Sequence, residues 1–143
     1  MMLLIGADPL TRFLNAAAER PFVWGEFDCL LWLADWIETR RGIDLGVNFR
    51  GCYSTMLQAA RIVRDADGMV SLVDMLTRGS GVRRASVGAR GDIAIVSVAG
   101  DGGAHFGNEA GAILLGGSAA LISQQGLVVP RMDYAPVVAA WKV

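Results

Sequence analysis

The chain has 143 residues, which is enough for one domain with a buried core and too few for two ordinary domains. Apolar residues make up 53% of it and charged residues only 19%, a balance that favours a buried contact with another subunit. The net charge is −1, and the pairs Arg40-Arg41 and Arg83-Arg84 are too short to neutralise a phosphate backbone, so nucleic acid is not an expected partner.

The apolar stretch at the start of the chain is short and lacks the basic leader of a secretory signal, and no run approaches the roughly 18 apolar residues that span a bilayer. We therefore expect a protein that folds in a cytoplasm without membrane insertion. There Cys29 and Cys52 remain reduced. One histidine and two widely spaced cysteines form no recognised ligand set, so no metal or other cofactor is expected.

Two helices are predicted in the first 42 residues. Asp8 as N-cap and Pro9 at the first helical position begin an amphipathic helix. Asp28 is expected to cap a second helix that runs to about Arg41, where Gly42 stops it. This second helix is apolar on almost every side and should be the central helix of the fold.

Two further helices follow, the first capped by Ser54 over residues 55–67 and the second over residues 69–79. The glycine- and arginine-containing segment 79–91 has little periodicity and is expected to be a connection. Five short β-branched or apolar segments then predict strands at residues 92–98, 110–116, 119–123, 127–132 and 137–143. Helices followed by strands indicate one α+β domain over residues 1–143, with the helices covering one face of an antiparallel meander.

Cys29 has two competing interpretations. A thiol in the first turn of a helix feels the positive end of the helix dipole, which favours the nucleophilic thiolate. Asp28, however, stands next to it, and no Lys, Arg or His lies within seven residues. From the residues alone, a buried and inert cysteine is favoured.

The segment FVWGEFDCLLWLADW, residues 22–36, resembles the signature of the NlpC-type cell-wall peptidases, a branch of the papain-like cysteine peptidases. RGDIAIV, residues 90–96, resembles the first sheet strand of that family. A smaller group of phage and prophage proteins encoded among tail genes is more similar still. Its members combine WGxxDC with an Arg-Gly-x-Tyr segment, here residues 50–53, and an Ala-Trp-basic-hydrophobic end, here residues 140–143.

The resemblance extends from about Pro21 to the end of the chain and implies a papain-like fold, in which the central helix headed by Cys29 packs on a C-terminal sheet. It also implies that Cys29 is the nucleophile and that a histidine in a His-x-Gly-hydrophobic setting, at the start of the second sheet strand, is the base. Two registers compete for that position. In one, His105 is the base; in the other, the strand is residues 110–116 and Glu109 takes the place of the histidine. Ser123 or Gln124 would orient the base.

Other residues have structural interpretations. Trp24, Trp32 and Trp36 are expected in the core rather than in a ligand cage. Asp28 is expected to be an N-cap rather than a general acid. Arg50 either anchors its loop over the cysteine or is solvated.

Two functions follow from the resemblance. The favoured one is a subunit of a phage tail tip or baseplate, which docks on hub or distal-tail proteins of the virion after assembly in the host cytoplasm. The alternative is an active cysteine peptidase or amidase that cleaves peptidoglycan stem peptides, with Cys29, His105 and Ser123 as catalytic residues. High apolar content and the absence of an export signal favour the first.

Overall fold

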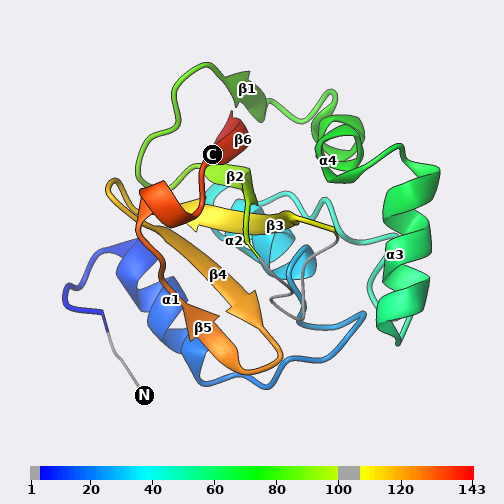
Figure 1. Ribbon diagram of the computed structural model, residues 1–143, viewed down its shortest axis with the longest axis horizontal. Coiled ribbons are helices and arrows are strands. Elements are labelled where there is room, and N and C mark those ends of the chain that lie inside the picture. The colour runs from blue at the N-terminus through cyan, green and yellow to red at the C-terminus, as the bar shows by residue number, and fades with distance from the viewer. Residues whose placement is uncertain (1–3, 100–106) are drawn as a thin grey trace.

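The computed structural model describes residues 4–99 and 107–143 (Figure 1). Within these residues, four α-helices come first in the chain and a six-stranded antiparallel sheet follows, which confirms the α+β class. The helices are α1 (Pro9–Ala18), α2 (Leu31–Arg41), α3 (Met56–Asp65) and α4 (Met69–Thr77). The strands are β1 (Arg83–Ala85), β2 (Ile93–Ser97), β3 (Glu109–Leu114), β4 (Ala119–Ser123), β5 (Gly126–Val128) and β6 (Val137–Lys142), with a 3₁₀ turn, η1 (Met132–Tyr134), before β6.

The sheet has the order β1-β6-β2-β3-β4-β5. Strands β2 to β5 form the expected meander. The last strand departs from it, because β6 returns to pair with the other edge of β2 and is itself flanked by β1. β1 lies inside the segment that was expected to be only a connection. That prediction was wrong because β1 is three residues long and two of them are exposed arginines, so it has neither the alternation nor the apolar residues that indicate a strand.

The helix ends follow from local chemistry. Asp8 caps α1 by accepting a hydrogen bond from the Thr11 amide, as expected. Gly42 ends α2 in the left-handed conformation, with φ of 73°. The cap of α3 is Thr55 rather than Ser54, because the Thr55 hydroxyl accepts from the Gln58 amide.

The second helix begins later than predicted. Its first helical residue is Leu31, so Cys29 lies in the turn that leads into α2. The carboxylate of Asp28 nevertheless accepts hydrogen bonds from the amides of Leu30 and Leu31, which is the capping role that was predicted for it.

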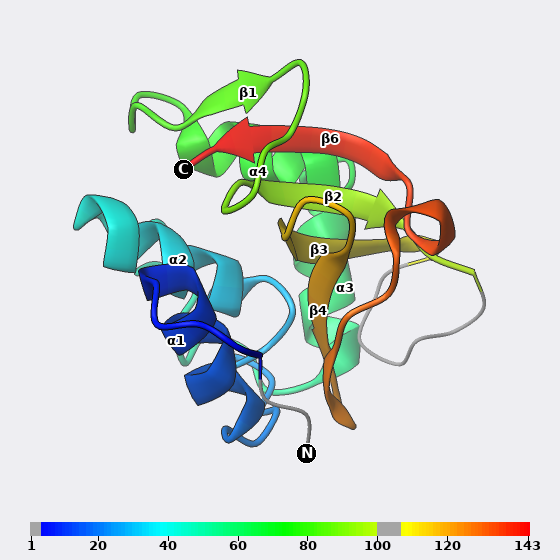
Figure 2. The same ribbon diagram turned by 90° about the vertical axis from the view of Figure 1, so that its left-hand side faces the viewer.

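The two faces of the sheet carry different apolar clusters. Isoleucines of β2 and β3, Ile93, Ile95 and Ile113, pack with Trp32 and Trp36 of α2 in the larger cluster. The opposite face is formed mainly by alanines, and η1 and the residue after it close over them; the fully or almost fully buried members include Ala94, Ala110, Ala112, Ala119, Ala135 and Ala140. In Figure 2, α1 and α2 lie on one side of the sheet and η1 on the other. The helices therefore cover one face, as predicted.

At Gly111, the sheet comes close to α2 and to the turn that leads into it. A Cβ atom at this position would lie 2.6 Å from the Cys29 carbonyl oxygen and 2.8 Å from Cδ1 of Leu33. The glycine thus allows β3 to pass directly beneath the start of the central helix.

Substitution of Gly111 by alanine tests this contact. The added methyl group would push against the Cys29 carbonyl, so we expect Gly111→Ala to lower the free energy of unfolding by about 1–3 kcal/mol, as overpacking does in other cores. Urea denaturation followed by circular dichroism measures the loss. Gly117→Ala is the matched control, since a Cβ there meets no atom within 4 Å. Equal stability of the two variants would contradict the close approach of α2 to β3.

Candidate functional site

Cys29 lies at the N-terminal end of the central helix, beside the sheet. Its side chain belongs to the core, because the residue is only 1% exposed. Its backbone carbonyl faces Gly111 in the middle of β3. The sequence-based prediction therefore placed the cysteine at the correct end of α2 and next to the sheet.

Asp28 organises the segments around Cys29. This carboxylate is 1% exposed, and its two oxygens accept four hydrogen bonds. Oδ1 accepts from the Leu30 and Leu31 amides, at 3.1 and 2.9 Å. Oδ2 accepts from the Gly25 amide at 2.9 Å and from the Tyr53 hydroxyl at 2.5 Å. Asp28 thus joins the turn before it, the start of α2 and the loop that carries Tyr53.

Gly25 allows the two loops to meet. Its φ of 83° favours glycine, and a Cβ atom there would collide with the carbonyl oxygen of Tyr53. The Gly25 carbonyl in turn accepts a hydrogen bond from the Gly51 amide at 2.8 Å. The WGEFDC and RGCY segments are therefore in backbone contact.

The surroundings of Cys29 oppose the thiolate. Burial raises the pKa of its thiol well above the ordinary value, and the negative charge of Asp28 raises it further. The two amides that follow Cys29 already donate to Asp28, so they do not stabilise a sulfur anion. Burial, followed by the charge of Asp28, also raises the pKa of Tyr53, whose hydroxyl remains protonated and donates to the carboxylate.

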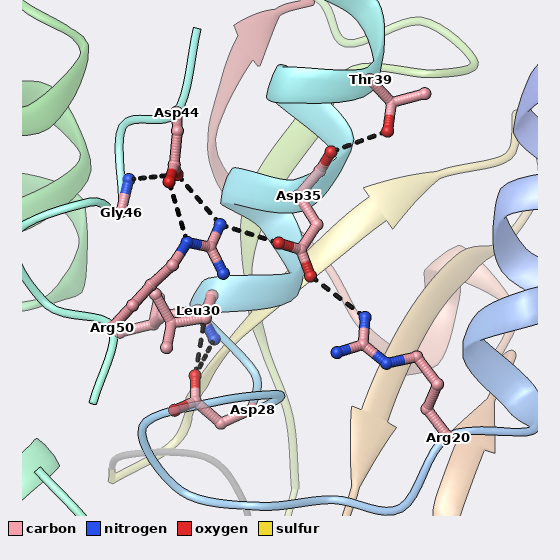
Figure 3. Close-up of polar contacts among 9 residues, drawn as sticks. Arg20, Asp28, Leu30, Asp35, Thr39, Asp44, Gly46 and Arg50 are labelled. Carbon is pink, nitrogen blue, oxygen red and sulfur yellow. Dashed lines mark hydrogen bonds and ion pairs between the residues drawn. The ribbon is translucent and has the colours of Figure 1, made fainter.

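Arg50 is bonded to carboxylates rather than solvated (Figure 3). It makes a bidentate pair with Asp44, with Nε–Oδ2 and Nη2–Oδ1 distances of 2.9 Å. Its Nη2 also lies 2.7 Å from Oδ1 of Asp35 on α2, and Arg20 reaches the other oxygen of Asp35 at 3.4 Å. The hydrogen bonds from Arg50 lower the pKa of Asp44. These ion pairs fasten the loop of residues 43–53 to the side of α2, next to the Asp28–Tyr53 contact.

The start of β3 bears on the two registers that were considered for the base. β3 begins at Glu109, as in the register that placed Glu109 at the histidine position. Gly111 and Ile113 face the helices, so Glu109, on the same face by alternation, points to the side on which α2 packs. His105 lies outside the described residues.

Ser123 stands at the end of β4. Its hydroxyl is used within the β4–β5 turn, where it accepts from the Gln125 amide at 3.2 Å and lies 3.3 Å from the Gly126 carbonyl oxygen. Gln124, the other orienting residue considered, is exposed in the same turn. Within the described residues, no hydrogen bond connects either side chain to Cys29 or Glu109.

The tryptophans behave largely as predicted. Trp32 and Trp36 are buried, with Phe13 of α1 against both rings, and the indole N–H of Trp36 donates to the Gly91 carbonyl at 2.7 Å. Trp24 is half-buried and packs edge-on against Phe22, so it belongs to the margin of the core.

An apolar crevice of about 60 Å³ lies beside this centre, between α2, the 43–53 loop, α3 and α4. Its walls include Leu31, Leu45, Ile62 and Leu72, whereas Asp28 and Cys29 are not among the lining residues. The crevice therefore does not open onto the thiol. Both cysteines of the chain are free, with Cys29 buried and Cys52 exposed.

In the described part of the chain, no cluster of three or more His, Cys, Asp or Glu side chains is placed to hold a metal ion. No helix there has both the length and the hydropathy to cross a membrane.

The sequence analysis did not predict the roles of Tyr53 and Asp44. Tyr53 was noted as part of the Arg-Gly-x-Tyr segment, but its partner, Asp28, lies 25 residues earlier. Asp44 lies six residues before Arg50, in a loop without periodicity. Only the folded chain brings these pairs together.

Removal of the Tyr53 hydroxyl tests the bond to Asp28. Tyr53→Phe leaves a buried carboxylate with one fewer donor, so we expect the free energy of unfolding to fall by about 1–3 kcal/mol. Tyr134→Phe is the matched control, because Tyr134 is 70% exposed. Urea denaturation of both variants measures the difference. A Tyr53→Phe variant as stable as the control would show that Asp28 does not depend on this bond.

The comparisons with known proteins give one match. No curated protein and no solved structure matches the chain. A family model described as a domain of unknown function, DUF6950, matches residues 7–143, which include α1 to α4 and the whole sheet. The chain belongs to the DUF6950 family.

Proposed function

We propose that the protein is a subunit of a phage tail tip or baseplate, built on an NlpC-like, papain-like domain whose cysteine has a packing role. It would dock on hub or distal-tail proteins of the virion after assembly in the host cytoplasm. The order of the motifs supports the kinship, as does the position of Cys29 at the end of a central helix that packs on β3.

The environment of Cys29 is the observation that carries the structural role. Cys29 is 1% exposed, and both burial and the adjacent Asp28 raise the pKa of its thiol. Because the thiolate is the nucleophile, a thiol held neutral at pH 7 attacks carbonyl groups poorly. Asp28 also receives its full set of donors from the protein itself, as expected of a structural carboxylate.

The base position gives a second line of support. Glu109 occupies it in the register that has the observed strand, two residues before Gly111 and on the face toward α2. A carboxylate there would disfavour the thiolate, whereas an imidazolium would favour it. Among the described residues, Asp28 is the charged group that acts on the Cys29 thiol, and its charge opposes a catalytic thiolate.

The exposed apolar side chains agree with a docking role. Twelve large apolar residues of the described chain are more than a third exposed, among them Val47, Leu57, Val87 and Tyr134. Together with the low share of charged residues, they fit a protein whose surface is partly covered in an assembly.

Alkylation of single-cysteine variants tests the state of the thiol. In Cys52→Ser, Cys29 is the one remaining thiol, and we expect almost no modification by iodoacetamide at pH 7, because the sulfur is buried and neutral. In Cys29→Ser, the exposed Cys52 is expected to react readily and serves as the control. Mass spectrometry reads both outcomes. Rapid alkylation of Cys29 in the folded Cys52→Ser protein would contradict a packing role.

Tail assembly in a phage that encodes this chain tests the function. We expect deletion of the gene to prevent formation of complete tails, whereas Cys29→Ala supports normal tails and normal plaque numbers, because the cysteine contributes only packing. Electron microscopy and plaque counts measure the two effects. Complete tails in the deletion strain would exclude an essential tail subunit.

The alternative is an active cysteine peptidase or amidase that acts on peptidoglycan stem peptides, which the placement of Cys29 beside β3 favours. The sulfur would add to the carbonyl carbon, the amine would leave with a proton, and water would hydrolyse the thioester. His105 would take the thiol proton, and Ser123 would orient it. A Cys29→Ala phage with complete tails and lost infection would favour this alternative over the packing role.

A further inference from the structure

A basic surface lies at the end of the molecule opposite the loops around Asp28. It is formed by side chains from four elements or their ends: Arg41 at the end of α2, Arg78 after α4, Arg83 in β1 and Lys142 in β6, all of them exposed. An open hollow of about 650 Å³ is lined by Arg78, Arg83 and Asp74, among other residues. The guanidinium of Arg41 lies beside this hollow, because its Nη1 would be 3.6 Å from a Cβ placed on Gly81, which is one of the lining residues.

The positive charge of this surface is only partly neutralised. Asp74 is held by Arg84 through a bidentate pair at 2.9 and 3.0 Å, and it also accepts from the Trp141 indole. The hydrogen bonds from Arg84 lower the pKa of Asp74, which remains ionised. Both of its carboxylate oxygens already accept hydrogen bonds from Arg84, and Oδ1 also accepts one from Trp141. Within the described residues, no ion pair involves the other cations of the surface, namely Arg41, Arg78, Arg83 and Lys142.

The same surface contains a free sheet edge. β1 is the first strand in the order β1-β6-β2-β3-β4-β5, so its outer backbone groups have no partner strand among the described residues. In Figures 1 and 2, β1, the end of β6 and the connection from α4 lie side by side. A segment in extended conformation can add to such an edge by main-chain hydrogen bonds.

Cations stand on both faces of this edge. Arg84 lies on the helix side, with its guanidinium 5.2 Å from the Trp141 ring. Because side chains alternate along a strand, Arg83 points to the opposite face, as does its cross-strand neighbour Lys142. A strand added to β1 would therefore have Arg84, which is paired with Asp74, on one face and the unpaired Arg83 and Lys142 on the other.

We propose that the free edge of β1 and its flanking cations bind an extended acidic segment of a partner protein. Arginine on an edge strand repels the same edge of another copy, and an acidic strand is the kind that this surface attracts. Guanidinium groups also pair with carboxylates in bidentate geometry. The net charge of −1 leaves no overall basic excess of the kind that proteins use to neutralise a phosphate backbone, so nucleic acid is not the expected partner. The proposal goes beyond the tail function and does not involve Cys29.

Fluorescence anisotropy of the full chain with labelled oligoglutamate tests the proposal. We expect binding at low salt that weakens as sodium chloride is added. Arg78→Glu/Arg83→Glu should lower the affinity at least ~ten-fold, since two attractive charges become repulsive. Arg61→Glu, at an exposed position on α3, is the matched control and should change it less than about two-fold. Thermal melting of each variant shows that the fold is retained.

Two further probes define the mode of binding. An oligoglutamate methylated at every peptide nitrogen keeps the charges but cannot donate to the strand edge, and we expect it to bind more weakly. A duplex DNA fragment is expected to bind more weakly than oligoglutamate. The proposal is overturned if oligoglutamate does not bind, or if Arg78→Glu/Arg83→Glu binds it as tightly as Arg61→Glu does. It is also overturned if the methylated probe binds as tightly as unmodified oligoglutamate, or if DNA binds more tightly than oligoglutamate. Cys29→Ser is expected to bind like the unmodified chain, so these results are separate from those on the thiol.

Discussion

The buried carboxylate of Asp28 is the group on which the arrangement around the central helix depends. A charge removed from water is tolerated only when it is fully hydrogen-bonded, and Asp28 meets that condition with two amides of the entering helix, the Gly25 amide and the Tyr53 hydroxyl. These donors come from three segments of the chain, and the carboxylate holds the three segments together. The same four bonds fix where α2 begins, how the preceding turn folds and where the following loop lies.

The hydrogen bonding of Asp28 has a direct electrostatic consequence for Cys29. The helix start that could have stabilised a thiolate already serves the carboxylate of the preceding residue. Its negative charge adds to the effect of burial, and both act in the direction of a protonated thiol. The feature that makes the WGEFDC segment fold well therefore makes its cysteine a weak nucleophile, unless a cationic group approaches it.

The sheet shows how side-chain size sets the thickness of each layer. Isoleucines on one face of β2 and β3 fill the space beneath two tryptophans of α2, where a helix stands far from the strands. Gly111 interrupts this pattern where the start of the helix comes close to β3. On the other face, the side chains are mainly alanines, which are small, so the short segment around η1 packs close to the strands and covers them. Trp32 and Trp36 of α2 thus pack in the isoleucine-rich cluster, on the face that carries the helices.

The sequence by itself determined the α+β class, the helix α1 with its Asp8 cap, the central helix with Asp28 before it and Gly42 after it, and the approximate positions of strands β2 to β6, although β5 ends at Val128, earlier than the expected 132. These features depend on local signals, namely capping chemistry, glycine and apolar periodicity. Tertiary structure decided what local signals cannot encode: the short strand β1, the return of β6 to β2, the pairing of Tyr53 with Asp28 and the ion pairs of Arg50. It also brought Arg41 and Arg83 to one surface, although each arginine pair alone is too short to indicate one. The physical reason is that these contacts join residues distant in sequence, and their energy exists only once the core has placed both partners.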